Sequence, residues 1–310
     1  MARVNRLRHG SIVRWVSPAS PIDSELLVRA SSMFESWGLK IEIADHALDR
    51  HFYLVGTDEN RAKDITDAFL DPRVDGIFCT RGGYGSARLM PYLDFPRISK
   101  SEKLFLGFSD ISTLHLALNH CDLPTFHGPM GITLHYDREE WVYKSLRDMV
   151  FGNVNSLQEF PGGEVIVPGT GEGILTGGCL CLLCDSLATS YPIHGEGKII
   201  LLEDVDENPH RIDAMLTHLL NSGVFRHARG IVVGEMTRTD DRMDETIGAR
   251  PWRDIVIDRL GSLGLPLILN YPIGHAKNML TLPLGVKARL DAEDVQHPGR
   301  LSIVENPFEL

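Results

Sequence analysis

The feature that most constrains the fold is an alternation of short apolar runs with helical patterns over the first 130 residues. Strand-like runs rich in β-branched and aromatic residues alternate with segments of helical periodicity. Strands and helices that alternate in this way form βαβ units, which build a parallel sheet. The expected strands are 12–16, 40–44, 75–80 and 104–108, and the expected helices are 24–37, 58–70 and 110–120.

A second region follows a stretch rich in Gly and Pro. Such a stretch, with Pro161-Gly162-Gly163 and Pro168-Gly169, is typical of a domain boundary. We therefore expect a first domain at 1–150, a linker at 151–173 and a second domain at 174–310. For the second domain we expect helices at 178–190 and 208–222, strands at 198–203, 230–234 and 265–270, and short strands over 279–304.

Composition excludes several classes of protein. The 42 acidic residues outnumber the 31 basic ones, and the net charge of −11 argues against nucleic acid as a partner. No run reaches the roughly 18 apolar residues of a membrane span, and Arg14 interrupts the short apolar run that could have formed a signal peptide. Five cysteines, an odd number, do not indicate a disulfide framework. We expect a cytoplasmic protein.

The strongest local signal for chemistry is the segment Phe105-Leu106-Gly107-Phe108-Ser109-Asp110. An apolar strand ends at Ser109 and a helix begins at once, which places a hydroxyl at the carboxyl edge of a parallel sheet, where ligands bind. The turn exposes the Ser109 hydroxyl beside the free N–H groups of a helix start. The alternative is that Ser109 is only a helix N-cap.

A glycine-rich loop, Cys79-Thr80-Arg81-Gly82-Gly83-Tyr84-Gly85, follows another expected strand. It has neither the Lys-Ser/Thr of a P-loop nor the G-x-G-x-x-G spacing of a dinucleotide site. Its backbone N–H groups could form an oxyanion hole, or the loop could be a plain turn.

A serine nucleophile needs a base and an orienting carboxylate. Among 13 histidines, His127 and His275 follow strand-like segments that could bring them near Ser109. Glu203 and Asp204 end an apolar strand, and alternation along the strand directs them to opposite faces. The alternative for these acids is a solvated loop.

Three cysteines, Cys179, Cys181 and Cys184, lie close together in the sequence. Neither a second pair of ligands at finger-like spacing nor an H-E-x-x-H motif accompanies them, and Cys is a common small core residue. We therefore interpret them as helix packing and expect no metal and no cofactor, so that excess chelator should leave the activity unchanged.

Taken together, these segments resemble the LD-carboxypeptidase family of serine peptidases, which also holds the microcin C self-immunity peptidases. The resemblance extends over nearly the whole chain, in order. It is carried by Arg81-Gly82-Gly83-Tyr84-Gly85, Gly107-Phe108-Ser109-Asp110, His127-Gly128-Pro129-Met130, Gly177-Gly178 with Leu180, Leu202-Glu203-Asp204-Val205 with Arg211-Ile212-Asp213, and Pro272-Ile273-Gly274-His275.

The resemblance implies a catalytic triad with Ser109 as nucleophile, His275 as general base and Glu203 as the residue that orients the base. It also implies an oxyanion hole from the backbone N–H groups of Asp110 and Gly83. His127 would then be a neighbour of the site. The implied fold is α/β, with an N-terminal flavodoxin-like doubly wound parallel sheet and a C-terminal α/β domain rich in short strands.

The activity implied by the resemblance is removal of a terminal D-alanine from a muropeptide tetrapeptide, by a homodimer with a small peptide as its substrate and no nucleic-acid or membrane partner. Two alternatives stay open at this point. One is an immunity-type peptidase that cleaves an amide next to an aminoacyl-nucleotide. The other is a non-catalytic protein that binds a small anionic ligand.

Overall fold

The computed structural model describes residues 3–248 and 250–309, and the chain forms two compact units. The first unit consists of Met1–Val154, Thr281–Gly285 and Asn306–Leu310, and the second of Asn155–Leu280 and Val286–Glu305. Each unit is built around one β-sheet. The first unit therefore takes up short segments that follow most of the second unit in the sequence.

The first unit contains a six-stranded sheet in the order β11-β5-β4-β3-β1-β2. All neighbouring strands are parallel except β11, which runs antiparallel to β5. The order β2-β1-β3-β4-β5 is that of a flavodoxin-like doubly wound sheet, as predicted. The strands are β1 (Ile12–Val16), β2 (Lys40–Ile43), β3 (Gly76–Cys79), β4 (Leu104–Gly107), β5 (Thr125–His127) and β11 (Leu282–Leu284).

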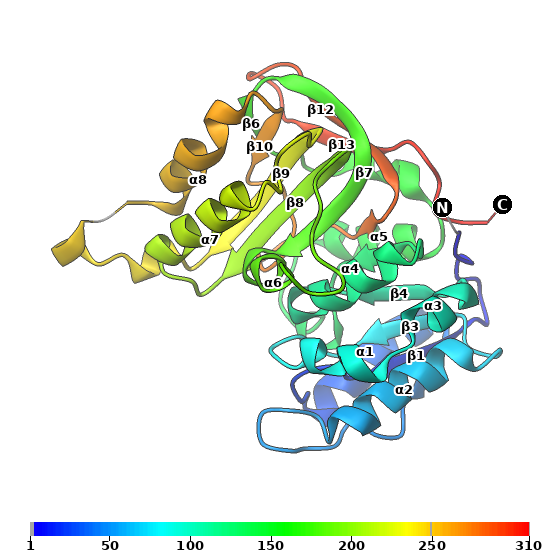
Figure 1. Ribbon diagram of the computed structural model, residues 1–310. Coiled ribbons are helices and arrows are strands. Elements are labelled where there is room, and N and C mark those ends of the chain that lie inside the picture. Colours follow the sequence, from blue (N-terminus) through cyan, green and yellow to red (C-terminus); the bar gives the residue numbers. More distant parts are fainter. Residues whose placement is uncertain (1–2, 249, 310) are drawn as a thin grey trace. The chain divides into compact units, whose positions relative to one another are not determined.

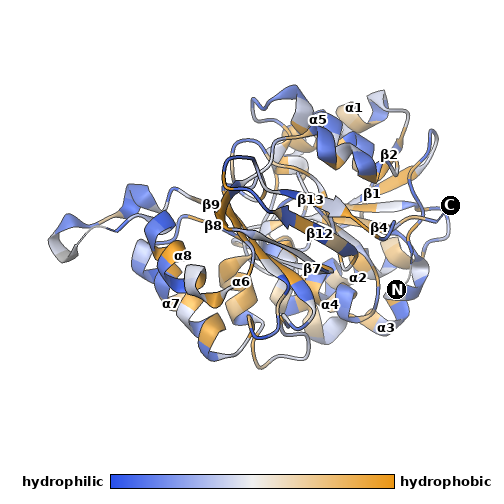
Figure 2. Ribbon diagram, turned by 90° about the horizontal axis from the view of Figure 1, so that it is seen from above, coloured by the Kyte–Doolittle hydropathy of each residue, from blue (hydrophilic) through white to orange (hydrophobic). Residues whose placement is uncertain are grey.

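Helices cover both faces of this sheet, with α1 and α5 on one side and α2, α3 and α4 on the other (Figure 2). Every residue of β3, β4 and β5 is buried, as expected for parallel strands covered on both faces. Edge-on contacts join Trp15, Phe34 and Phe78 in the core. The helices are α1 (Ser24–Ser36), α2 (Asp58–Leu70), α3 (Phe95–Ile98), α4 (Ser112–His120) and α5 (Glu140–Val150).

The second unit contains a seven-stranded mixed sheet in the order β13-β12-β7-β8-β9-β10-β6. The four strands β7 to β10 are parallel, and antiparallel strands flank them on both sides. Helices α6 (Leu180–Asp185), α7 (Pro209–Asn221) and α8 (Trp252–Leu260) lie in a row beside this sheet (Figure 1). The strands are β6 (Glu164–Val167), β7 (Gly169–Cys179), β8 (Lys198–Val205), β9 (Gly230–Thr237), β10 (Leu267–Leu269), β12 (Lys287–Ala292) and β13 (Arg300–Ile303).

Residues 151–173 are not the linker that we expected from the sequence, because they include β6 and the first part of β7. The glycines of β7 are needed for close packing between backbones. A Cβ atom added at Gly171, Gly173 or Gly177 would overlap a carbonyl oxygen of a neighbouring segment. The same strand extends to Cys179, so the expected helix 178–190 begins only at Leu180.

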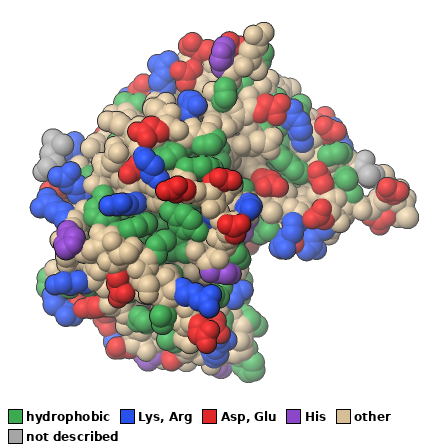
Figure 3. All heavy atoms as spheres, turned by 180° about the vertical axis from the view of Figure 1, so that it is seen from behind, with side chains coloured by type: hydrophobic (Ala, Val, Ile, Leu, Met, Phe, Trp, Pro, Cys, Tyr) green, Lys and Arg blue, Asp and Glu red, His purple; other side chains and the backbone are tan. Residues whose placement is uncertain are grey.

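The described part of the chain contains no helix that is both long and apolar enough to cross a membrane. On the face shown in Figure 3, acidic and basic side chains lie among one another instead of gathering into a single basic stripe.

Candidate active site

Ser109 lies on a sharp turn between a strand and a helix in the first unit. Strand β4 ends at Gly107, Phe108 is extended, and Ser109 has a φ of 64°. Such a positive φ is uncommon for a residue other than glycine, and strained residues of this kind cluster at functional sites. Ser109 does not occupy an N-cap position, because Phe108 caps the short helix η3 (Ser109–Ile111) and Ile111 caps α4.

The glycine-rich loop packs directly against this turn. A Cβ atom added at Gly82 would lie 2.9 Å from Cβ of Ser109 and 3.3 Å from the backbone nitrogen of Asp110. Gly83, which has a φ of 104°, instead faces Ser20. Gly82 is therefore the glycine whose lack of a side chain permits the approach to Ser109.

Two buried charged residues, Asp110 and Arg61, hold the glycine-rich loop in place. The backbone N–H of Ser86 donates a hydrogen bond of 2.8 Å to the carboxylate of Asp110. Arg61, which is 1% exposed, donates to the carbonyl oxygens of Gly85 and Pro18. Burial raises the pKa of the Asp110 carboxyl, and the hydrogen bonds from Ser86 act in the opposite direction. Asp110 thus links the end of the glycine-rich loop to the Ser109 turn, and Arg61 links the same loop to the segment at Pro18.

Two histidines are buried beside the same turn. His127 ends β5, where it pairs with Gly107 of β4, and its ring lies 5.7 Å from that of Phe108. The Nε2 atom of His115 lies 2.9 Å from the carbonyl oxygen of Gly107. Burial lowers the pKa of His115 to about 3, so this ring is neutral at physiological pH. His127 is therefore buried in the first unit, beside the end of the strand that leads to the Ser109 turn.

Glu203 and His275 form a hydrogen-bonded pair in the second unit. Glu203 lies near the end of β8 and is 0% exposed, and His275 follows β10 in a loop. The Nδ1 atom of His275 lies 2.7 Å from Oε2 of Glu203, and the backbone N–H of His275 donates to the same oxygen at 3.2 Å. A carboxylate in this position holds the proton on Nδ1 and leaves Nε2 as an acceptor.

Two glycines shape the space around this pair. Gly274 has a φ of 75°, and a Cβ atom there would overlap the Glu203 carboxylate. A Cβ atom at Gly234 of β9 would lie 3.2 Å from Cβ of Glu203. Gly274 must therefore lack a side chain for His275 to reach Glu203, whereas a side chain at Gly234 would first meet Ile273, whose Cγ1 lies 2.7 Å from the added Cβ.

The surroundings of His275 act on its pKa in opposite directions. Burial lowers the pKa, while the charge and hydrogen bond of Glu203, with the charges of Asp204 and Asp206, raise it. The net result is a raised pKa. The ring therefore takes up a proton more readily than an isolated histidine, which suits a group that becomes an imidazolium during a reaction.

Asp204 is buried as well, so the alternative of a solvated loop for the two acids was wrong. Its carboxylate accepts hydrogen bonds from the backbone N–H groups of Cys181, at 2.9 Å, and Val205, at 2.8 Å. Burial, and after it the charge of Glu203, raises the pKa of Asp204 to about 6. Glu203 forms a hydrogen bond with His275, whereas Asp204 accepts one from the start of α6. The two neighbouring acids therefore have different partners.

Sequence reasoning missed Gly82, Arg61 and Gly234. A signal for Gly82 was present, since two adjacent glycines leave open which of them faces the serine. No sequence signal marked Arg61 or Gly234, because their contacts join segments that are distant in the sequence.

Comparison with solved structures shows which class of protein shares this fold. A muramoyltetrapeptide carboxypeptidase from Oxalobacter formigenes is similar with a TM-score of 0.81 and 26% identity, over 96% of this chain and 100% of that one. The microcin C7 self-immunity protein MccF, in complex with glutamyl sulfamoyl guanosine, is similar with a TM-score of 0.84 and 20% identity, over the full length of both chains. The chain thus has the fold of a two-domain peptidase.

The sequence comparisons identify the family. Residues 13–128 match the LD-carboxypeptidase N-terminal domain, and residues 172–290 match the LD-carboxypeptidase C-terminal domain. A putative carboxypeptidase of Streptomyces coelicolor is 37% identical over 94% of each chain, and a murein tetrapeptide carboxypeptidase of Pseudomonas aeruginosa is 32% identical over 90% of this chain and 92% of its own. The chain belongs to the LD-carboxypeptidase family and is a hydrolase of the carboxypeptidase type. This confirms the predicted family.

Proposed function

We propose that this protein is a serine-type LD-carboxypeptidase that removes the C-terminal D-alanine from a muropeptide tetrapeptide and leaves a tripeptide. The observation that carries the chemistry is the buried Glu203–His275 pair, with 2.7 Å between carboxylate and ring, in a chain whose Ser109 lies on a strained turn. The substrate class rests on the relatives named murein peptide and murein tetrapeptide carboxypeptidases.

In this proposal Ser109 is the nucleophile and His275 the general base. His275 Nε2 takes the proton from the Ser109 hydroxyl as Oγ attacks the carbonyl carbon of the L,D amide bond. The amine of D-alanine then leaves with a proton from His275, and water hydrolyses the acyl-enzyme with the same base. Glu203 keeps the ring in the required tautomer and stabilises the imidazolium.

The proposed oxyanion hole consists of the backbone N–H groups of Asp110 and Gly83. The packing of Gly82 against Ser109 supports a role for this loop, because it brings the loop backbone beside the serine. Backbone N–H groups that are fixed before the reaction stabilise a developing oxyanion most effectively. The contacts of Arg61 and Asp110 with the loop supply that rigidity.

The deciding experiment is incubation with purified tetrapeptide muropeptide, followed by mass analysis. We expect a tripeptide and free D-alanine, a reaction unaffected by excess chelator, and no cleavage of the peptide that ends in L-alanine. Equal turnover of the two isomers would remove the proposed specificity.

A second substrate in the same assay tests the alternative of an immunity-type peptidase. An aminoacyl sulfamoyl nucleoside is the type of ligand bound by MccF. Faster cleavage of this compound than of the muropeptide would favour the alternative. From the family resemblance we further propose a cytoplasmic homodimer, and sedimentation of the purified protein tests the dimer.

A further inference from the structure

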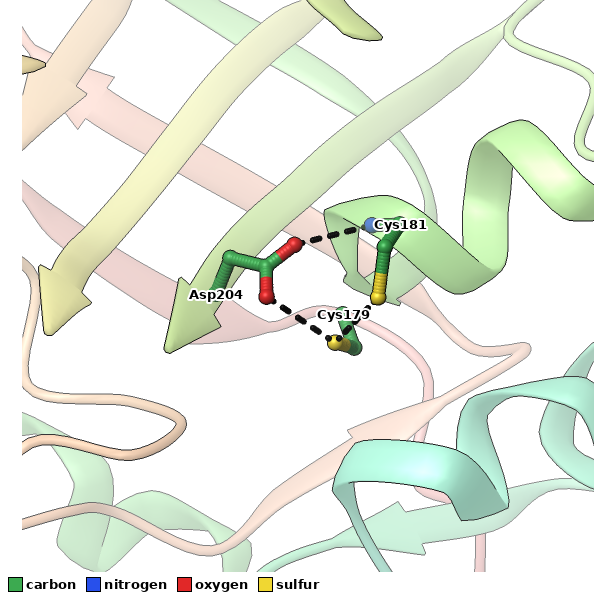
Figure 4. A group of neighbouring side chains, drawn as sticks. All are labelled: Cys179, Cys181 and Asp204. Carbon is green, nitrogen blue, oxygen red and sulfur yellow. Dashed lines mark hydrogen bonds between the residues drawn. The ribbon is translucent and has the colours of Figure 1, made fainter. Parts of the chain in front are cut away.

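Two thiols and a carboxylate outside the proposed triad converge in the second unit. Cys179 is the last residue of β7, Cys181 lies in the first turn of α6, and Asp204 lies on the neighbouring strand β8 (Figure 4). One ligand atom from each lies within 4.8 Å of the others. The sequence brings the two cysteines together, but only the pairing of β7 with β8 adds the carboxylate, 25 residues away from Cys179.

The spacing of these atoms suits a tetrahedral metal ion. With Zn–S bonds of about 2.3 Å and Zn–O bonds of about 2.0 Å, tetrahedral geometry separates two sulfurs by about 3.8 Å and a sulfur from an oxygen by about 3.5 Å. The two sulfurs lie 3.4 Å apart, and Sγ of Cys179 lies 3.6 Å from Oδ1 of Asp204. The third pair, Sγ of Cys181 and a carboxylate oxygen of Asp204, lies within 4.8 Å, so the three side chains can surround one cation.

The carboxylate is already oriented. The backbone N–H groups of Cys181 and Val205 hold both oxygens of Asp204, and the residue is 1% exposed. Cys179 is 3% exposed, whereas Cys181 is only partly buried, which leaves access from solvent. Glu203 and Glu207 add negative charge near Asp204. Without a cation, Sγ of Cys179 donates a hydrogen bond to Oδ1 of Asp204, and a divalent cation would take the place of the thiol proton there.

We propose that Cys179, Cys181 and Asp204 bind a thiophilic divalent cation such as Zn²⁺, with solvent as the fourth ligand. This replaces our expectation from the sequence that the cysteines only pack and that the protein takes no metal. Binding releases the two thiol protons and joins the end of β7, the start of α6 and the end of β8 through one ion. The role is structural, because Ser109 chemistry needs no metal.

The test uses the full-length protein, reduced and freed of metal, and titrates it with Co²⁺ under anaerobic conditions. We expect one equivalent to bind, with absorption bands from thiolate-to-cobalt charge transfer, and Zn²⁺ to displace it. Cys179→Ser and Cys181→Ser should each weaken binding by more than about 100-fold, since even changes in the groups around a metal's ligands cost 10- to 100-fold. Asp204→Asn should weaken it while retaining the charge-transfer bands.

Cys184→Ser is the matched control, because Cys184 lies on the same helix but its sulfur contacts the carbonyl oxygen of Met215 at 3.4 Å. This variant should bind Co²⁺ as the parent does. A thermal melt with and without Zn²⁺ gives a second readout: the parent should gain stability and Cys181→Ser should not. Absence of stoichiometric binding, or bands that survive in Cys179→Ser or vanish in Cys184→Ser, would overturn the assignment.

The metal site and the proposed peptidase activity are tested independently. Ser109→Ala should bind Co²⁺ normally, so loss of peptidase activity leaves the metal assignment intact. Failure of Co²⁺ binding in an active enzyme would refute the metal site and leave the triad standing.

Discussion

The two units hold their candidate catalytic groups by different means. In the first unit, the backbone sets the position of Ser109 through a turn with a φ of 64° and a glycine loop packed against it. In the second unit, burial and a short hydrogen bond set the position of the Glu203–His275 pair. A group positioned by its backbone can lose its side chain with little structural cost, whereas removing one member of a buried polar pair leaves the other without its partner.

The largest effect on activity should come from Ser109→Ala. Removing the nucleophile should lower kcat by about four to six orders of magnitude. The melting temperature should stay close to that of the parent, because the backbone turn is retained. Steady-state kinetics and a thermal melt check both parts. A variant that keeps more than a tenth of the rate would exclude Ser109 as nucleophile.

Glu203→Gln should lower kcat by about two to four orders of magnitude, because an amide can present N–H to the ring and favour the wrong tautomer. It should also lower stability more than Ser109→Ala does, since it replaces a buried charged partner of His275. Asp204→Asn is the comparison, because Asp204 is the buried neighbour that bonds to α6. It should keep the rate within about tenfold of the parent. The reverse result, with Asp204→Asn inactive but folded, would mean that the wrong carboxylate was assigned.

Gly274→Ala should lower kcat/KM by about 100-fold, because a misplaced catalytic group has an effect of that size. The new methyl group would overlap the Glu203 carboxylate and push His275 away. Gly223→Ala controls for backbone strain, since Gly223 has a φ of 77° and no atom within 4 Å of an added Cβ. Both variants should lose stability from backbone strain, Gly274→Ala more because of the overlap with Glu203, but only Gly274→Ala should lose activity. Equal activities of the two variants would show that Gly274 is not required for the Glu203–His275 pair.

The smallest expected effect is a shift in the pH profile. His275 must be neutral to act as a base, and its pKa is raised above the ordinary value of 6.5. Activity should therefore fall as the pH drops through a midpoint above 6.5. In Glu203→Gln the midpoint should move to lower pH, because the attraction that raises the pKa is gone. The measurement is kcat/KM against pH for both proteins, and coincident acid limbs would argue against His275 as the base.

More of the first sheet than of the second could be predicted from the sequence. The reason lies in what the residues next to each strand indicate. In the first unit, β1, β3 and β4 are apolar runs that end near a Gly or Pro, and there the pattern and the structure agree. Strand β5 was not among the expected strands, and β11 was expected in the second domain. In β7, glycines that indicate a turn in sequence instead allow backbones to pack closely. Local composition cannot distinguish these two uses of glycine.

The candidate site likewise has features that could be predicted from the sequence and features that could not. The strand-to-helix turn at Ser109 could be predicted, because it depends on adjacent residues. Burial of Asp204 could not, since its environment comes from Cys179 and Cys181 on elements that pair with β8 only in the folded unit. The role of Arg61 could not be predicted either, because its guanidinium donates to the carbonyl oxygen of Gly85, 24 residues further along the chain.

The sixth strand of the first sheet has a consequence for how the protein is made. Strand β11 pairs with β5 through Leu282 and His127, and Phe308 stacks on Phe126 at 5.4 Å. When only the first 154 residues have been synthesised, neither β11 nor Phe308 is present. Strand β5 therefore remains the edge strand of the sheet until the second unit has been synthesised. Vectorial synthesis delays completion of the first unit until the second has emerged, so the first unit cannot be produced whole without the chain of the second.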